Sequence, residues 1–292
     1  MPRRVTARVR SEFSAPISRR QALAAGPLLG LATTASLATP IPRIRSYDFD
    51  RPGDTIHALV KIIGDVSGRT TYGWSQGEIF GLTPGALARP LLRYESCRIG
   101  RYIAGADGAF EYRYRGMIFY KDYDTGAFID RFRNPYTEAI VPVRHFQTSI
   151  GRYVYTERGV APNAAFKGET GKRFGEPFRL PWTIVGDDIW VTLDERVRYR
   201  RPSDGEYRVD NAILRYAAKN RALEDARLTS VPCTSSWQTQ LNWFGWLGMD
   251  AREGMIMQGG HGRKFETLEE LPPALRKFAE LKFPGSTSSP IE

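Results

Sequence analysis

The stretch from Phe110 to Tyr120 alternates between two kinds of side chain, and this alternation limits the fold more than any other feature of the chain. One set is mostly aromatic or apolar, and charged or mixed residues fall between its members. Because successive side chains of a strand point to opposite faces, the pattern predicts a strand with one aromatic face. Similar alternation recurs later in the segments 127–133, 140–146, 151–156, 188–193, 196–201 and 208–216.

Turn residues separate these segments. They include Asp107-Gly108, Asp124-Thr125-Gly126, Asn134-Pro135, Gly186-Asp187 and Ser203-Asp204-Gly205. Short strands with tight turns and no long helices between them predict a mainly β protein built as an antiparallel meander. We expect the meander to close into a calycin-like barrel, because closure removes exposed edges and leaves room for one small ligand. A two-sheet β-sandwich is the alternative.

A C-terminal helix is expected over residues 274–282. Thr267 to Glu270 has the form of a capping box, and Pro272 and Pro273 suit the first turn of the helix that follows. An apolar stripe then recurs at a spacing of three residues, at Leu275, Phe278 and Leu281. We expect this stripe to cover one end of the barrel.

The N-terminus carries the parts of an export signal. Arg19 and Arg20 precede an uncharged run, Ala22 to Ala38, which is too short and too interrupted to span a bilayer stably. The pattern resembles a twin-arginine signal, which implies export of the folded protein by the twin-arginine translocase, cleavage near Ala38 and a periplasmic destination. The expected organisation is therefore a signal over 1–38, a linker over 39–48 and a single β-barrel domain over 49–292.

Charge and cysteine content exclude several classes of function. The formal net charge is +10, but six arginines and one glutamate of that balance belong to residues 1–38. The remaining basic residues lie among acidic ones, so nucleic-acid binding is not expected. With three histidines and no Cys-x-x-Cys motif, we expect no zinc site, no iron–sulfur centre and no cofactor. A hard cation held by carboxylates stays open as an alternative. Cys97 and Cys233 either form one disulfide or stay unpaired and buried.

The segment from Tyr120 to His145 resembles one protein family. It contains a strand ending in Tyr120-Lys121-Asp122, the turn Asp124-Thr125-Gly126, the run Asn134-Pro135-Tyr136-Thr137 and a strand ending in Val143-Arg144-His145. These pieces are similar to the domain-of-unknown-function family numbered 1838, and the resemblance covers roughly 49–284. It implies a shared fold and pocket without an assigned activity. Three places depart from the family pattern. Phe132 stands where the family often has Trp, and Glu138 stands where it commonly has Gly. The segment 147–149 also differs.

Three residues are the candidates for catalysis. His145 falls in phase with Val141 and Val143, which predicts an apolar, cavity-facing position where an imidazole acts as general acid or base. The alternative is a histidine satisfied in the core or at the surface. Tyr112 and Tyr114 are expected to face inward, where a phenol can donate a hydrogen bond to a carbonyl or enolate.

The candidates for ligand binding are mainly aromatic. The cluster comprises Trp182, Trp237, Trp243, Trp246 and Met249, and it forms either a pocket wall or a hydrophobic plug. His261 lies among Gly259, Gly260 and Gly262, which predicts close approach of a ligand to the backbone or else a hairpin turn. Glu111 and Arg113 mark a polar site if they lie inside the barrel, or a solvated outer face if they do not.

These features predict a periplasmic protein with an aromatic-lined pocket for a small apolar or aromatic molecule. Its activity is either cofactor-independent isomerase, cyclase or lyase chemistry, or non-catalytic carriage of such a ligand. An interaction protein with an exposed aromatic patch is a third possibility. No serine nucleophile elbow or dinucleotide fingerprint occurs in the sequence.

Overall fold

A computed structural model describes residues 44–148, 150–162, 178–200, 207–249 and 251–291. All described elements belong to the unit formed by residues 42–292. The expected export signal lies outside the described residues. Among the helices that are described, none has the length and apolar character needed to cross a membrane.

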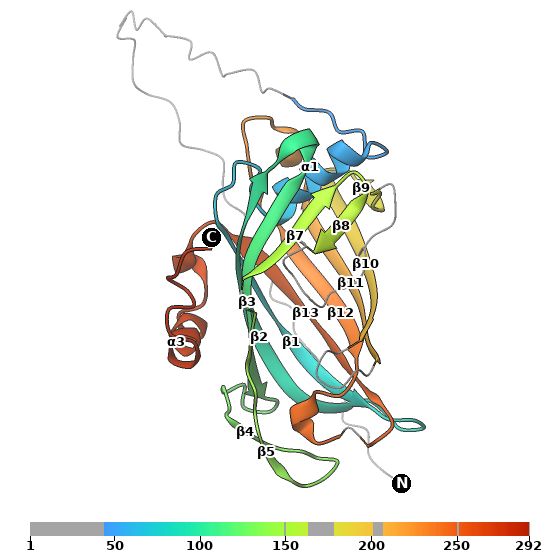
Figure 1. Ribbon diagram of the computed structural model, residues 1–292, viewed down its shortest axis with the longest axis vertical. Coiled ribbons are helices and arrows are strands. Elements are labelled where there is room, and N and C mark those ends of the chain that lie inside the picture. Colours follow the sequence, from blue (N-terminus) through green and yellow to red (C-terminus); the bar gives the residue numbers. More distant parts are fainter. Residues whose placement is uncertain (1–43, 149, 163–177, 201–206, 250, 292) are drawn as a thin grey trace, which may run out of the picture. The chain divides into compact units, whose positions relative to one another are not determined.

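One large antiparallel sheet forms most of the unit 42–292 (Figure 1). Its longer strands are β1 (Thr71–Leu82), β2 (Arg89–Ala104), β3 (Phe110–Asp122), β10 (Asp188–Arg200), β11 (Tyr207–Lys219), β12 (Thr234–Leu241) and β13 (Met255–Phe265). The shorter strands are β6 (Phe146–Gln147), β7 (Gly151–Thr156), β8 (Gly159–Pro162) and β9 (Trp182–Val185). The order is β8-β7-β3-β2-β1-β13-β12-β11-β10-β9, and β6 also pairs with β3.

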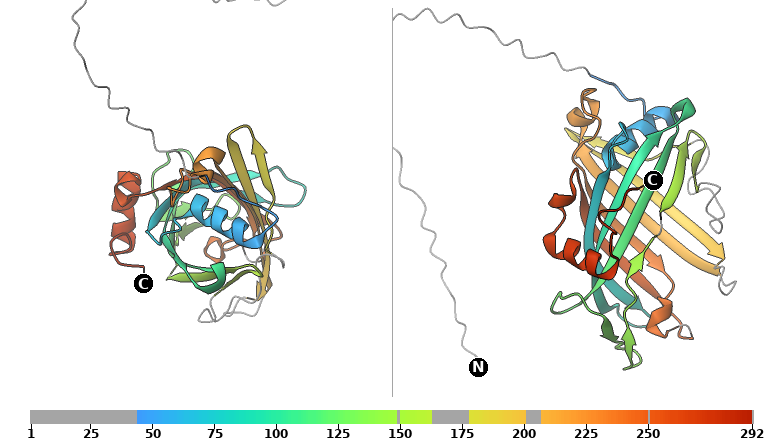
Figure 2. Two further views of the ribbon diagram at one scale, coloured as in Figure 1. Left: turned by 90° about the horizontal axis from the view of Figure 1, so that it is seen from above. Right: turned by 60° about the vertical axis from the view of Figure 1, so that its left-hand side comes forward.

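The sheet curls around the helix α1 (Pro52–Ile63), which lies inside the curl when viewed from above (Figure 2). This confirms the prediction of a mainly β, antiparallel fold. The ends of the strand order are β8 and β9, and no pairing between described strands joins them. Strands β4 (Arg131–Arg133) and β5 (Ile140–Pro142) form a separate pair, so the alternation over 127–133 and 140–146 predicts more strand than the structure contains.

Helix α1 closes one end of the curl, and the sequence analysis does not anticipate it. Pro52 opens the helix, and its apolar positions face the sheet from several sides, so that Ile56, Leu59 and Val60 are fully buried. They pack with tyrosines of the sheet in one core cluster. Residues 56–63 are nearly all apolar, so no helical spacing of apolar and polar residues is visible there. An apolar run of this length is also typical of a buried strand.

Helix α3 (Pro273–Lys282) begins at the predicted prolines and follows a capping box formed by Thr267 and Glu270. It does not cover an end of the sheet as expected. Its buried residues, Leu275 and Ala279, pack against Cys97 and other side chains on the convex face. Leu281, the last residue of the predicted apolar stripe, is 71% exposed, because the end of the helix extends past the sheet. The role expected of this helix belongs to α1.

Candidate functional site

The register of the strands assigns each side chain to one face of the curl. On β2 the residues that point to the concave face are Tyr94, Ser96, Arg98, Gly100 and Tyr102. The intervening Cys97 and Ile99 pack under α3 on the convex face. The alternation along β2 therefore places Arg98 on the concave face.

Exposure varies along the concave face in a way that defines a hollow. Tyr102 and Tyr112 are buried next to α1, and Tyr94 and Tyr120 are buried near the opposite end. Between these two levels, Arg98 is exposed. Ser75, Ser96, Tyr114, Gly116, Ile118, Leu214 and Trp237 are partly exposed at the same intermediate level. Solvent thus reaches the middle of the concave face while both ends are packed.

Small residues explain why this middle region is open. Gly73 on β1 and Gly116 on β3 lie directly opposite Arg98 on its two neighbouring strands, so no side chain covers the guanidinium at that level. One step along the strands, Ser75 pairs with Ser96, and their hydroxyl oxygens are 2.6 Å apart. The hollow therefore has hydroxyl groups and bare backbone beside the Arg98 guanidinium.

Tyrosine rings form a continuous stack above Arg98. The ring centroids of Tyr102 and Tyr112 are 4.3 Å apart, those of Tyr112 and Tyr114 are 5.0 Å apart, and those of Tyr114 and Tyr153 are 5.7 Å apart, all with nearly parallel planes. The Arg98 guanidinium carbon lies 5.2 Å from the Tyr114 ring centroid. This distance is within the range of a cation–π contact.

The electrostatics of the hollow keep Arg98 charged and the phenols neutral. Burial lowers the pKa of Arg98, but the oxygens of Tyr112, Tyr216 and other tyrosines raise it by more. Burial raises the pKa of the Tyr112 hydroxyl, and the neighbouring Arg98 opposes only part of that rise. Tyr112 is therefore a hydrogen-bond donor at neutral pH, next to a permanent positive charge.

Of the residues proposed for catalysis, Tyr112 and Tyr114 lie on the concave face and His145 does not. The His145 ring contacts Phe119 and Phe278 beneath α3, with its side chain 5% exposed. Its Nδ1 accepts the backbone N–H of Tyr120 at 3.2 Å, and its Nε2 lies 3.4 Å from Asp130. Residues 143–145 are not in a strand, so the alternation used to orient His145 does not apply to it.

The tryptophan cluster divides among three places. Trp243, Trp246 and Met249 pack with Tyr120 in the core cluster at the end of the curl opposite α1, as the plug alternative predicts. Trp182 lies near α1, stacked on Phe49 at 4.4 Å. The Trp237 ring contacts Tyr94, with centroids 5.5 Å apart, and Trp237 is the cluster member nearest the hollow.

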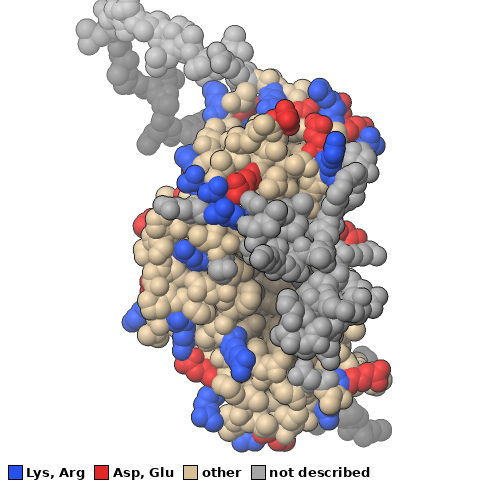
Figure 3. All heavy atoms as spheres, viewed as in Figure 1, with Lys and Arg blue, Asp and Glu red and all other residues tan. Residues whose placement is uncertain are grey.

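Glu111 and Arg113 form an ion pair on the convex face of β3. The Arg113 Nε and Nη2 atoms donate to the two Glu111 carboxylate oxygens at 3.0 and 3.1 Å. Both side chains are about a quarter exposed, so the outer-face alternative describes them. In Figure 3 the Lys and Arg atoms of the described residues lie in small groups interspersed with Asp and Glu.

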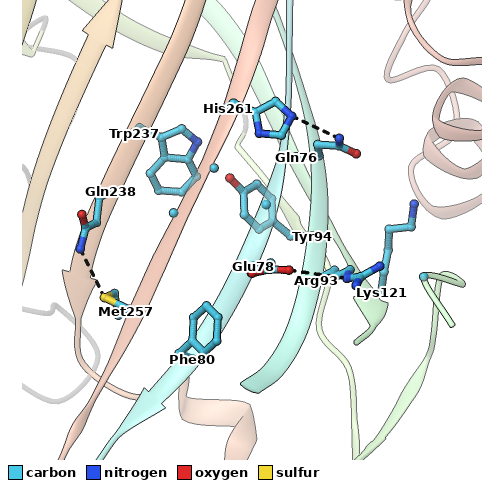
Figure 4. Close-up of a pocket in the computed structure, with 14 residues that line it drawn as sticks. Gln76, Glu78, Phe80, Arg93, Tyr94, Lys121, Trp237, Gln238, Met257 and His261 are labelled. Carbon is cyan, nitrogen blue, oxygen red and sulfur yellow. Dashed lines mark hydrogen bonds and ion pairs between the residues drawn. The ribbon is translucent and has the colours of Figure 1, made fainter. Parts of the chain in front are cut away.

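A groove of about 680 Å³ lies on the sheet around β1 and β13, here termed the convex groove (Figure 4). Its lining residues are Gln76, Gly77, Glu78, Phe80, Arg93, Tyr94, Lys121, Gly126, Trp237, Gln238, Met257, Gly259, Gly260 and His261. His261 points outward here and contacts the Gln76 amide at 3.3 Å. His261 and Trp237 are thus the predicted binding residues that line this groove.

Arg98, Ser75 and Ser96 are site residues that the sequence analysis misses. The sequence does carry a signal for Arg98, because in a strand over Tyr94–Tyr102 it points to the same face as the two tyrosines. Within the described residues, no group of three or more His, Cys, Asp or Glu side chains is placed to bind a metal ion.

The fold and the hollow define a class of protein: a curled antiparallel sheet with one end closed by a helix and a solvent-accessible concave face. The family model for the protein of unknown function DUF1838 matches residues 68–292, and the chain belongs to this family. A search of curated proteins finds no match.

Proposed function

We propose that this protein binds a small planar molecule with an acidic group in the hollow of the concave face. The observation that carries the proposal is Arg98, an exposed residue of the hollow whose guanidinium carbon lies 5.2 Å from the Tyr114 ring centroid. A cation in such a position provides a strong, directional partner for a carboxylate or a related oxyanion.

The walls of the hollow suit the rest of such a ligand. Tyr114 and Trp237 offer aromatic surface, and Ile118 and Leu214 offer aliphatic surface. Aromatic rings next to a few polar groups are typical of small-molecule sites. The Ser75 and Ser96 hydroxyls can hydrogen-bond a polar substituent.

The experiment compares two ligands that share a planar aromatic body and differ at the end group, a carboxylate in one and a neutral hydroxymethyl group in the other. We expect cinnamate to bind in calorimetric titration and cinnamyl alcohol to bind at least about tenfold more weakly, because one charge-assisted hydrogen bond contributes about 1.5–3 kcal/mol. The variant Arg98→Gln should remove this preference. The matched control Arg215→Gln changes an exposed arginine on the other face of β11 and should bind as the wild type does. Equal binding of both ligands, or of neither, contradicts the proposal.

Enolate-stabilising catalysis is a second candidate, favoured by the neutral Tyr112 phenol next to Arg98. Both groups donate hydrogen bonds, so together they can stabilise an enolate oxygen while solvent accepts the proton. Phenylpyruvate is a suitable probe, with exchange of its methylene protons for deuterium followed by NMR. We expect the protein to accelerate exchange and Tyr112→Phe to reduce that acceleration at least about tenfold. No acceleration by the wild type would leave binding as the function.

We also propose that the chain is exported to the periplasm through Arg19 and Arg20, as its N-terminal sequence suggests. Replacing both residues by lysine should leave the precursor in the cytoplasm at its full mass. Cell fractionation with mass analysis tests this, and unchanged export would contradict it.

A further inference from the structure

We propose that the convex groove is a second binding site and that its ligand is a neutral oligosaccharide. This inference is separate from the proposed function, because the side chains of the groove, Tyr94 and Trp237 apart, belong to the opposite face from Arg98. It rests on the bare floor of the groove, the pairing of its charges and the chemistry of the polar groups left over.

The floor of the groove is backbone. A Cβ atom placed on Gly77 would lie 1.9 Å from the Gly259 carbonyl oxygen, and one on Gly260 would lie 2.1 Å from the Gln76 carbonyl oxygen. Neither position can carry a side chain without moving a strand, and both would direct it to the concave face beside Tyr94 and Trp237, so these glycines hold the strands close together. Gly259, between Glu78 and Gln238 in the register, leaves a gap in the row of outward side chains. The groove is thus built into paired strands, which position its walls firmly.

The charged residues of the groove already have partners of opposite sign. Glu78 lies 3.9 Å from Arg93, and Lys121 donates to Glu95 at 3.1 Å. Glu95 is a buried carboxylate that also accepts the Trp74 indole N–H at 2.8 Å. An ionic ligand would therefore have to compete with existing ion pairs, whereas a neutral ligand would not.

The remaining polar side chains of the groove on the convex face are two amides and one imidazole, and the amide of Gln238 is poorly satisfied. The Gln238 amide donates to the Met257 sulfur at 3.3 Å, and a thioether is a weak acceptor. Gln76 and His261 contact each other at the exposed opposite side. In Figure 4 the Gln238–Met257 pair and the Gln76–His261 pair lie at different sides of the groove. Planar amides and imidazole both donate and accept, which matches the paired donor and acceptor character of sugar hydroxyls.

An aromatic ring completes the site. Phe80 lies beside Met257 along the groove, and its ring is braced edge-on by Tyr123 at 6.2 Å. The C–H face of a pyranose is apolar and packs on such a ring. The volume of about 680 Å³ is within the usual range for small-molecule sites.

Calorimetric titration of the full mature chain with three probes tests the proposal. The probes are maltotriose, cellotriose and triacetylchitotriose. We expect at least one to bind with a Kd of about 1 mM or tighter, and Gln238→Leu to weaken it at least about fivefold. Gln240→Leu is the matched control, since Gln240 is exposed on the same face of β12 but does not line the groove.

Three outcomes would overturn the proposal. The first is that none of the probes binds at a Kd below about 10 mM. The second is that Gln238→Leu and Gln240→Leu bind equally, which would place the sugar elsewhere. The third is loss of sugar binding in a folded Arg98→Gln variant, which would assign the sugar to the concave face. Circular dichroism of each variant checks that the fold is intact.

Discussion

Glu138 has a left-handed backbone conformation, with φ of 59°. A side chain at such a position costs free energy, because its Cβ crowds the following carbonyl group. Glycine, which has no Cβ, adopts this conformation without that cost. The compensating ion pair with Arg133 spans 3.5 Å between two exposed side chains, so it contributes little.

We therefore expect Glu138→Gly to raise the free energy of unfolding by about 0.5–1 kcal/mol, despite the greater freedom of glycine in the unfolded chain. Urea denaturation measures the change. Gly126→Ala is the opposing control, since Gly126 has φ of 69° and the added Cβ should destabilise the turn. A loss of stability in Glu138→Gly would show that the ion pair outweighs the backbone strain.

His57 provides a pH dependence at the residue scale. Its pKa is lowered to about 4, chiefly by burial and in addition by the charge of the neighbouring Arg45. Its Nε2 accepts a hydrogen bond from the Arg45 guanidinium at 2.9 Å, so the proton of the neutral ring is on Nδ1, which donates to the Tyr47 hydroxyl at 3.0 Å. The folded state thus holds His57 neutral at pH values where the unfolded state protonates it.

Because the folded pKa is below the unfolded value of about 6.5, this contribution is complete above pH 6.5 and is lost as pH falls toward 4. We expect the free energy of unfolding to fall by about 1–3 kcal/mol over that range through this residue. His57→Gln should reduce the slope, whereas His261→Gln, at an exposed position, should not. Equal slopes in all three proteins would refute the assignment.

At the scale of elements, α1 is attached to the sheet through its C-terminal end. The Lys264 Nζ atom, from β13, donates to the carbonyl oxygens of Gly64 at 2.7 Å and Lys61 at 3.1 Å, and to the Ser230 hydroxyl at 2.7 Å. The last carbonyl groups of a helix have no partner within it, and a cation there also interacts favourably with the helix dipole. Lys61 in turn donates to the Leu223 carbonyl at 2.6 Å.

Replacing Lys264 by methionine should cost about 2–4 kcal/mol, because it leaves buried acceptors without a donor while keeping most of the side-chain volume. Arg263→Met is the control, since the adjacent Arg263 is exposed on the opposite face of β13. Thermal and chemical unfolding measure both. We expect proteolysis within α1 to accelerate in Lys264→Met alone, and similar losses in the two variants would exclude the attachment.

At the scale of the whole described unit, four core clusters divide the protein between the two faces of one sheet. Cys97 belongs to the cluster beneath α3, whereas Cys233 belongs to the cluster between α1 and the strands near β10. Both thiols are free and buried, and burial raises the pKa of each to about 12. The sequence alone left a disulfide open as an alternative to two unpaired cysteines.

Both thiols should therefore be inert in the native protein. We expect no reaction with a thiol reagent under native conditions and reaction of two thiols per chain after denaturation, because the reactive thiolate is suppressed by burial. A reducing agent should leave the melting temperature unchanged. A reducing-agent-dependent melting temperature would indicate a disulfide.

Parts of the fold were predictable because their patterns are local. The alternation over Phe110–Tyr120 identifies β3, and the capping box and prolines identify the start of α3. Strands β1 and β13 are less visible in the sequence, because glycines such as Gly77 and Gly260 interrupt their apolar phase. These glycines are required where the strands approach closely, so the feature that weakens the sequence pattern is the one that shapes the groove.

The sequence by itself determined the antiparallel β class, the family and the inward phase of Tyr112 and Tyr114, since each depends on residues close together in the chain. Only the tertiary structure decided that α1 closes the curl, that α3 covers the convex face and that His145 is packed beneath it. It alone combined Arg98 with glycines from both neighbouring strands and a stack of tyrosines. Those placements depend on strand order and curvature, which arise from contacts between distant segments and leave no periodic trace in the sequence.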